Sequence, residues 1–115
     1  MRRGEVYYIR LDPTEGSEQG GTRPAIIVSR DAINLSSPVV VVAPCTTYQG
    51  QRLYPSQVLL QPPEGGLTVR SVAMAEQIRT ISTRRLGRLQ GSLSRAALRQ
   101  LERAMVHALD LPWPV

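Results

Sequence analysis

Two short, uninterrupted apolar runs constrain this chain more than any other feature. They are Pro-Ala-Ile-Ile-Val-Ser at residues 24–29 and Pro-Val-Val-Val-Val-Ala at residues 38–43. A strand with one face in water alternates apolar and polar residues, whereas a strand covered on both faces is apolar throughout. Neither run approaches the roughly 18 to 20 apolar residues that span a bilayer. The two runs therefore predict central strands of a buried sheet in a soluble protein.

Further strand signals flank these two runs. Residues 5–11 are rich in β-branched and aromatic types and end at the turn signal Asp12-Pro13. Weaker signals, separated by turn-forming segments, follow at residues 57–60, 68–74 and 77–81. The middle of the chain is therefore expected to form a β-meander.

The hydrophobic period changes near the C-terminal end. Apolar residues recur at helical spacing at Ala97, Leu98, Leu101, Ala104, Met105, Ala108 and Leu109. Ser94 can cap such a helix and Pro112 can stop it, so a helix is predicted over residues 94–109. Strands first and a helix last predict a mainly β, α+β fold, and the length suits one domain over residues 1–115.

The charge is unevenly distributed along the chain. All fourteen basic residues are Arg, and the formal net charge is +5. Residues 1–69 carry six Arg and six acidic residues, whereas residues 70–115 carry eight Arg and three. This asymmetry indicates an anionic partner, with nucleic acid the first candidate. In the basic segment 70–115, an i, i+4 stripe is formed by Arg95, Arg99, Arg103 and His107, and we expect it to be the solvated face of the helix.

Several kinds of chemistry are excluded by the single Cys45 and the single His107. They cannot form an internal disulfide, a thiolate or imidazole zinc site, or a histidine-pair catalyst. Cys45 lies at the end of an apolar run, which favours an inert core thiol. We therefore expect no metal and no cofactor. The start of the chain lacks the apolar stretch of a secretory signal, so a cytoplasmic location is expected.

The segment at residues 12–22 contains no large apolar residue. A segment of this length between two strands is either a mobile surface loop or a functional one. Gly20 and Gly21 permit close approach of the backbone to a ligand, while Ser17, Gln19 and Thr22 supply hydrogen-bonding groups.

Polar residues at the strand ends are the other candidates. Arg23 precedes a proline, which restricts its backbone and therefore its direction. Thr46 and Thr47 follow the second apolar run, where a neighbouring strand can bring one of these two hydroxyls beside Arg23. The alternatives are a surface arginine and a turn-capping hydroxyl. In a strand over 77–81, Gln77 and Arg79 share one polar face, although Glu76 and Arg79 can also be scaffold that holds the loop.

Three sequence motifs together point to a particular protein family. They are Gly16-Ser-Glu-Gln-Gly-Gly-Thr-Arg-Pro24, Ala43-Pro-Cys-Thr46 and Glu76-Gln-Ile-Arg-Thr-Ile81, in this order and spacing. With them, the chain resembles the MazF/PemK family of toxin endoribonucleases over nearly its whole length. The resemblance implies an SH3-like barrel or five-stranded antiparallel sheet with helices. It also implies a homodimer that cleaves single-stranded RNA and is inhibited by a cognate antitoxin.

The resemblance also implies roles for particular residues. The catalytic pair falls on Arg23 and Thr46. The residues expected to bind or position RNA are Ser17, Glu18, Gln19, Gly20, Gly21, Thr22, Gln77 and Arg79. Two departures from the family pattern are the acidic Glu15 in the loop and Cys45 in place of an aliphatic residue.

The expected chemistry needs no metal, because RNA can be cleaved by its own 2′-hydroxyl once the phosphate is aligned and its charge stabilised. A metal mechanism would have to use Asp12, Glu15 and Glu18. The antitoxin is expected to bind through an acidic C-terminal segment. A dimer is also expected on packing grounds, because one helix can cover only one face of the strands that begin at Pro24 and Pro38.

Two other functions remain open at this point. A non-catalytic toxin of the same fold would bind DNA gyrase, and it would not need the pair of Arg23 and Thr46. A plain RNA-binding module would need aromatic side chains interleaved with basic ones. The aromatic residues are too scattered for that pattern: Tyr7, Tyr8, Tyr48, Tyr54 and Trp113.

Overall fold

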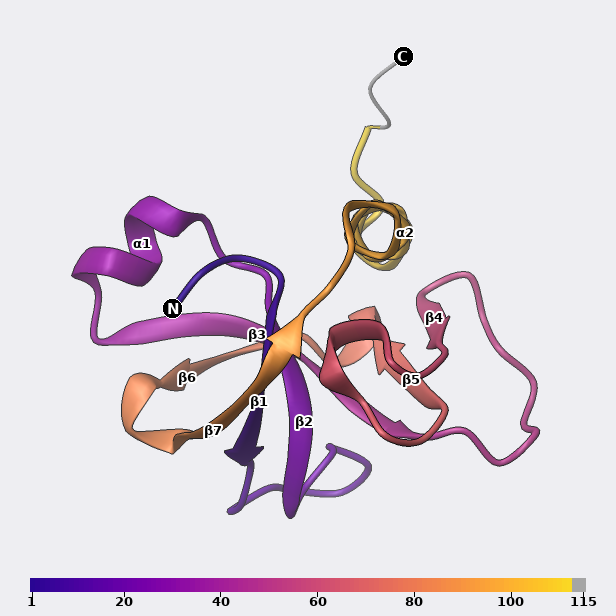
Figure 1. Ribbon diagram of the computed structural model, residues 1–115, viewed down its shortest axis with the longest axis horizontal. Helices are drawn as coiled ribbons and strands as arrows, with labels where there is room; N and C mark the ends of the chain where they lie inside the picture. The colour runs from indigo at the N-terminus through magenta and orange to yellow at the C-terminus, as the bar shows by residue number, and fades with distance from the viewer. Residues whose placement is uncertain (113–115) are drawn as a thin grey trace.

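The computed structural model describes residues 1–112, so Trp113 lies outside the described residues. The described part contains seven strands, two α-helices and three 3-10 turns (Figure 1). The strands are β1 (Glu5–Arg10), β2 (Thr22–Ile27), β3 (Val39–Thr47), β4 (Gln57–Leu60), β5 (Ser71–Met74), β6 (Arg79–Ser82) and β7 (Leu86–Ser92). The helices and 3-10 turns are α1 (Asp31–Ser36), η1 (Glu64–Gly66), η2 (Ala75–Gln77), η3 (Thr83–Arg85) and α2 (Arg95–Leu109).

The strands pair in the order β4-β5-β3-β2-β1-β7, and β6 pairs with β3 beside this path. Every pairing is antiparallel. The long β3 contacts three partners, because β6 lies along its first half, β5 along its last residues and β2 along its middle. The mainly β fold with a C-terminal helix is therefore confirmed, with seven strands in the described residues instead of the five that the resemblance implied.

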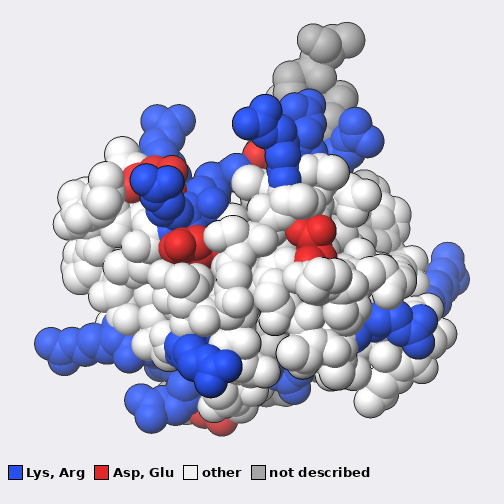
Figure 2. Space-filling view, viewed as in Figure 1, with Lys and Arg blue, Asp and Glu red and all other residues white. Residues whose placement is uncertain are grey.

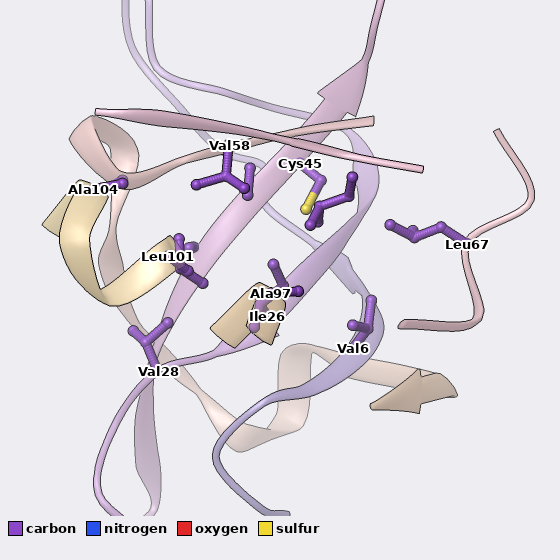
Figure 3. Close-up of a cluster of buried hydrophobic side chains, with 13 residues drawn as sticks. Val6, Ile26, Val28, Cys45, Val58, Leu67, Ala97, Leu101 and Ala104 are labelled. Atoms are coloured by element: carbon purple, nitrogen blue, oxygen red, sulfur yellow. The ribbon is translucent and has the colours of Figure 1, made fainter. Parts of the chain in front are cut away.

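The central strands are buried on both faces, as their uninterrupted apolar runs predict. Ile26 and Ile27 are adjacent in β2, point to opposite faces of the sheet, and are both 0% exposed. Ile26 packs in the cluster that includes Leu101 of α2, whereas Ile27 packs in a second cluster with Ile9 and Ile81. Figure 3 shows Leu101 and neighbouring α2 side chains facing the strand residues.

The second cluster corrects one expectation. We expected a second subunit to cover the face of the sheet that α2 leaves open. Instead, residues of β1, β3 and β6 close over Ile27 from within the same chain, because the twisted sheet curls back on itself. The packing of these strands therefore gives no argument for a dimer.

The C-terminal helix begins and ends as its sequence predicts. The Ser94 side chain accepts a hydrogen bond from the backbone N–H of Ala97 at 3.1 Å, and α2 ends at Leu109 before Asp110, whose φ is +53°. The four residues predicted to form a solvated stripe are all exposed, namely Arg95, Arg99, Arg103 and His107. Figure 2 shows arginine side chains over α2. No helix of the described residues is both long and apolar enough to cross a membrane.

Two elements were not predicted. The helix α1 has six residues and is anchored where the buried Asn34 bonds to the hydroxyl and carbonyl of Ser29. The strand β7 reads Leu-Gly-Arg-Leu-Gln-Gly-Ser, which lacks the β-branched residues and alternation of a typical strand.

Several strand boundaries also differ from the prediction. The strand expected over 68–74 begins at Ser71, and the strand expected over 77–81 begins at Arg79, because Gln77 belongs to a 3-10 turn. The two apolar runs at 24–29 and 38–43 correspond to strands over 22–27 and 39–47.

The tightest backbone contact predicts a specific loss of stability. A Cβ on Gly66, whose φ is +75°, would lie 2.1 Å from the Gln90 carbonyl oxygen, whereas one on Gly50, at φ +83°, would meet no atom within 4 Å. Gly50→Ala should cost about 1–2 kcal/mol for the left-handed backbone alone. Gly66→Ala should cost a further ~1–3 kcal/mol because the backbones must separate. Urea unfolding measures both, and equal losses would show that Gly66 and Gln90 are not packed as described.

Candidate functional site

The pairing of β2 with β3 brings together the two residues singled out at the strand ends. Ala25 lies opposite Pro44 in this pair. Two residues farther along the same register, Arg23 faces Thr46, and Nη1 of Arg23 donates a hydrogen bond to Oγ1 of Thr46 at 3.1 Å. Nε of Arg23 also donates to the Gly20 carbonyl at 2.6 Å. The guanidinium is thus held at two points, and its other N–H groups stay available for a ligand.

A cleft of about 370 Å³ opens beside this pair. The loop contributes Gly20 and Gly21, the start of β2 contributes Thr22, Arg23 and Pro24, and the end of β3 contributes Cys45, Thr46 and Thr47. The remaining walls come from elements far away in the sequence, namely Tyr8 of β1, Gln90 of β7, the segment Leu67, Thr68 and Val69, and Ser71 of β5. The chain therefore presents a fixed cation and a hydroxyl in an open, half-polar cleft, which suits an extended anionic ligand.

The loop between β1 and β2 is folded into a defined shape. Its base is closed by a hydrogen bond from the Leu11 N–H to the Gly21 carbonyl at 2.9 Å. Its tip is a turn in which the Glu18 carboxylate accepts from the Glu15 N–H at 2.6 Å. The left-handed φ of +73° at Gly21 lets the chain reverse just before Arg23. The loop is thus arranged around the cleft by its own hydrogen bonds.

A second hollow of about 240 Å³ is lined by residues of the same loop, of the turn η2 and of the start of β6. Its lining includes four predicted site residues, Glu18, Gln19, Gln77 and Arg79. The exposed Ser17 lines neither hollow. The predicted residues therefore divide into one group beside Arg23 and another group beside Gln77.

The hydrogen bonds of Arg79 and Glu76 run to different elements. Nη1 of Arg79 donates to the Leu11 carbonyl at 3.3 Å, so this side chain supports the base of the loop. Glu76 instead accepts from Gln57 Nε2 at 2.7 Å, which ties it to β4. The face shared by Gln77 and Arg79 was also inferred from the wrong element, because Gln77 belongs to a 3-10 turn.

Neither of the other titratable candidates offers an accessible reactive group in the cleft. Cys45 is 1% exposed in β3, and burial raises the pKa of its thiol to about 12. His107 is exposed on α2 and does not line the cleft. Among residues 1–112, no three His, Cys, Asp or Glu side chains converge in a group that could hold a metal ion.

Tyr8 and Gln90 were not singled out from the sequence. The buried residues of the first strand region are Val6, Ile9 and Leu11, whose spacing breaks the two-residue period of a regular strand. That irregularity is a signal of a bulge that turns Tyr8 outward. Gln90 carried no comparable signal, because its strand was itself not predicted.

The chain is similar to proteins of known activity. Residues 2–109 match the family described as PemK-like, MazF-like toxin of type II toxin-antitoxin system. The chain is 46% identical over 116 aligned positions to endoribonuclease MazF9 of Mycobacterium tuberculosis, covering 96% of this chain and 98% of that protein.

Solved structures show the same likeness. A mycobacterial endoribonuclease in complex with its cognate antitoxin is 32% identical, with a TM-score of 0.81 and coverage of 99% of both chains. MazF from Deinococcus radiodurans is 25% identical, with a TM-score of 0.82 and coverage of 96% of both chains.

Burial of Cys45 predicts how its thiol reacts. A pKa raised from 9.0 to about 12 leaves far less thiolate at pH 8 than an exposed thiol has, and burial also blocks reagents. Labelling by a thiol reagent at pH 8 should therefore be at least about a hundredfold slower in the native protein than in urea. Rapid labelling of the native protein would show that Cys45 is accessible and ionised.

Proposed function

This chain belongs to the PemK-like, MazF-like family of toxins of type II toxin–antitoxin systems, and from that premise we propose that it cleaves single-stranded RNA at short sequences, without a metal, through the substrate's own 2′-hydroxyl. The enzyme class is endoribonuclease of the MazF type. The observation that carries the proposed chemistry is the hydrogen bond of 3.1 Å between Arg23 and Thr46 on a wall of the cleft.

The proposed reaction is an in-line displacement at phosphorus. The 2′-oxygen loses its proton and bonds to phosphorus, while the bond from phosphorus to the 5′-oxygen breaks and that oxygen takes up a proton. The products are a 2′,3′-cyclic phosphate and a 5′-hydroxyl. The protein's part is to align these atoms and to stabilise the charge that develops on the phosphoryl oxygens.

Arg23 and Thr46 fit this part as a unit. Because the Thr46 oxygen accepts from Arg23, its own proton is free to donate to a phosphoryl oxygen. The bond from Arg23 Nε to the Gly20 carbonyl fixes the plane of the guanidinium before substrate arrives. Donors held in advance cost no reorganisation during the reaction. This pair favours cleavage over the two alternatives, a gyrase-binding toxin and a plain RNA-binding module.

The RNA is proposed to lie along the loop, over both hollows. Gly20, Gly21 and Thr22 would contact it near the scissile phosphate. The other proposed contacts are Ser17, Glu18, Gln19, Gln77 and Arg79. Glu18 is already engaged in the loop turn and Arg79 with the Leu11 carbonyl, so these two residues shape the path more than they grip the substrate.

The proposed partners are a second copy of the chain and an acidic antitoxin segment, both in the cytoplasm. One similar structure contains a mycobacterial endoribonuclease with its cognate antitoxin, which supports an antitoxin here. The net charge of +5 and the cation in the cleft suit a peptide of opposite charge. Such a peptide would compete with RNA for the same cleft.

The proposed chemistry predicts the effect of substitutions at Arg23 and Thr46. Removal of one prearranged donor typically costs about a hundred- to thousandfold in rate, so Thr46→Ala should fall in this range and Arg23→Ala at or beyond it. Arg23→Lys should also lose most of the rate, because an ammonium lacks the planar fork that grips two oxygens. Single-turnover cleavage measures the loss. Binding to an RNA with 2′-deoxyribose at the cut site should weaken far less.

Matched controls separate this chemistry from its competitors. Arg99→Lys and His107→Ala change exposed residues of α2 and should leave cleavage nearly unchanged. Cleavage should persist in EDTA, and each cut should carry a 5′-hydroxyl. Loss of activity in EDTA, or near-normal cleavage by Arg23→Ala, would overturn the proposed chemistry.

The proposed partners predict an oligomeric state and a mode of inhibition. The purified chain should sediment as a dimer at tens of micromolar. A synthetic acidic segment of the antitoxin should raise the apparent KM for RNA without changing kcat, whereas a scrambled neutral peptide should do neither. A monomer would contradict the proposed dimer, and an antitoxin that blocks turnover while RNA stays bound would contradict competition.

A further inference from the structure

The pairing of β1 with β7 is interrupted twice beside the cleft. Val6 lies opposite Gly91, Tyr7 opposite Leu89 and Ile9 opposite Leu86, with a register shift at each step. One step along β1 from Val6 to Tyr7 corresponds to two steps along β7, so Gln90 is an extra residue with no partner. A bulge of this kind turns side chains away from the direction that regular pairing would give them.

The bulge is held in place by close contacts between backbones. The turn η1 packs against it so tightly that a Cβ on Gly66 would lie 2.1 Å from the Gln90 carbonyl oxygen. A Cβ on Gly91 would likewise lie 2.9 Å from the Gly65 carbonyl carbon. The segment that leaves η1, residues 67–69, forms the facing wall of the cleft. The position of Gln90 is therefore fixed relative to both walls.

Two residues beside the bulge, Tyr8 and Gln90, line the cleft. Tyr8, which pairs with the proline next to Arg23, is 39% exposed and lines the cleft. Gln90 is half-buried there, and its side-chain hydrogen bond within the described residues runs from Nε2 to the Arg88 carbonyl at a long 3.3 Å. Its carboxamide oxygen is without a donor among those residues.

Selectivity must come from groups other than the Arg23 and Thr46 pair. Contacts to phosphate position a nucleic acid but are the same for every sequence, whereas contacts to the base edges distinguish one base from another. An exposed aromatic ring offers a surface on which a single-stranded base stacks. A carboxamide offers a donor and an acceptor side by side, which matches the paired donor and acceptor on a base edge.

We propose that Tyr8 and Gln90 form a nucleobase subsite, in which one base next to the scissile phosphate stacks on Tyr8 and is read at its edge by Gln90. The inference rests on the proposed cleavage of RNA and adds to it the residues that select the base at one position. The bulge gives the reason for the selectivity, because it fixes the carboxamide at a set distance from the cleavage pair.

The experiment compares cleavage patterns on one long RNA of defined sequence. The 5′-hydroxyl ends are sequenced after treatment with wild-type protein, Gln90→Glu, Gln90→Leu, Tyr8→Leu and the exposed control Gln61→Leu. Gln90→Leu should lower discrimination at one position flanking the cut by about ten- to a hundredfold. Gln90→Glu, which keeps the shape but only accepts, should change the preferred base at that same position. Gln61→Leu should reproduce the wild-type pattern.

A second measurement keeps the proposal testable if a variant cleaves poorly. Binding is measured to short RNAs that carry 2′-deoxyribose at the cut site and differ only in the flanking base. Tyr8→Leu should weaken binding to all of them by roughly five- to a hundredfold, whereas Tyr8→Phe, which keeps the ring, should not. Circular dichroism confirms that each variant is folded.

The outcomes distinguish failure of the proposed base subsite from failure of the proposed RNA cleavage. If wild-type protein cuts RNA and every Gln90 variant retains the same base preference, the subsite is wrong and the proposed cleavage stands. If wild-type protein leaves no 5′-hydroxyl ends, the proposed chemistry itself is wrong. A preference that changes at a distant position instead of the flanking one also overturns the assignment.

Discussion

The antiparallel register between β2 and β3 is the constraint on which the rest of this structure depends. It is fixed by burial, because a slip of one residue would exchange Ile26 and Ile27 between two separate clusters and expose both strands' apolar runs to the wrong neighbours. The same register sets Arg23 opposite Thr46 at the point where the strands leave the core. The strand register that packs the core therefore also sets the geometry of the cleft.

The parts of the fold that follow local rules could be predicted from the sequence. The doubly buried strands are visible as unbroken apolar runs, and α2 is visible from its period and from the cap at Ser94. Arg23 and two hydroxyls, those of Thr46 and Thr47, could be named because they lie near such runs, and the family resemblance then singled out Thr46. Their contact could not be derived from the sequence alone, since the register that produces it is a relation between strands.

What escaped prediction depends on contacts between distant parts of the chain. The strand β7 has little strand propensity of its own, and it is held in place by β1 and by the turn at Gly65 and Gly66. The residues of β7 carry no signature of the bulge, so Gln90 could not be recognised as a residue of the cleft. The packing argument for a second subunit failed for a related reason, because the curling of a sheet is a property of the whole sheet.

The cleft residues are spread along most of the chain, which determines when the cleft can form during synthesis of the protein. Its residues extend from Tyr8 to Gln90, and β3 cannot complete its pairing until β5 and β6 exist. A chain growing from the N-terminus therefore has Arg23 and Thr46 long before it has the walls that would hold a substrate. The complete cleft therefore cannot form until the chain has been synthesised past Gln90.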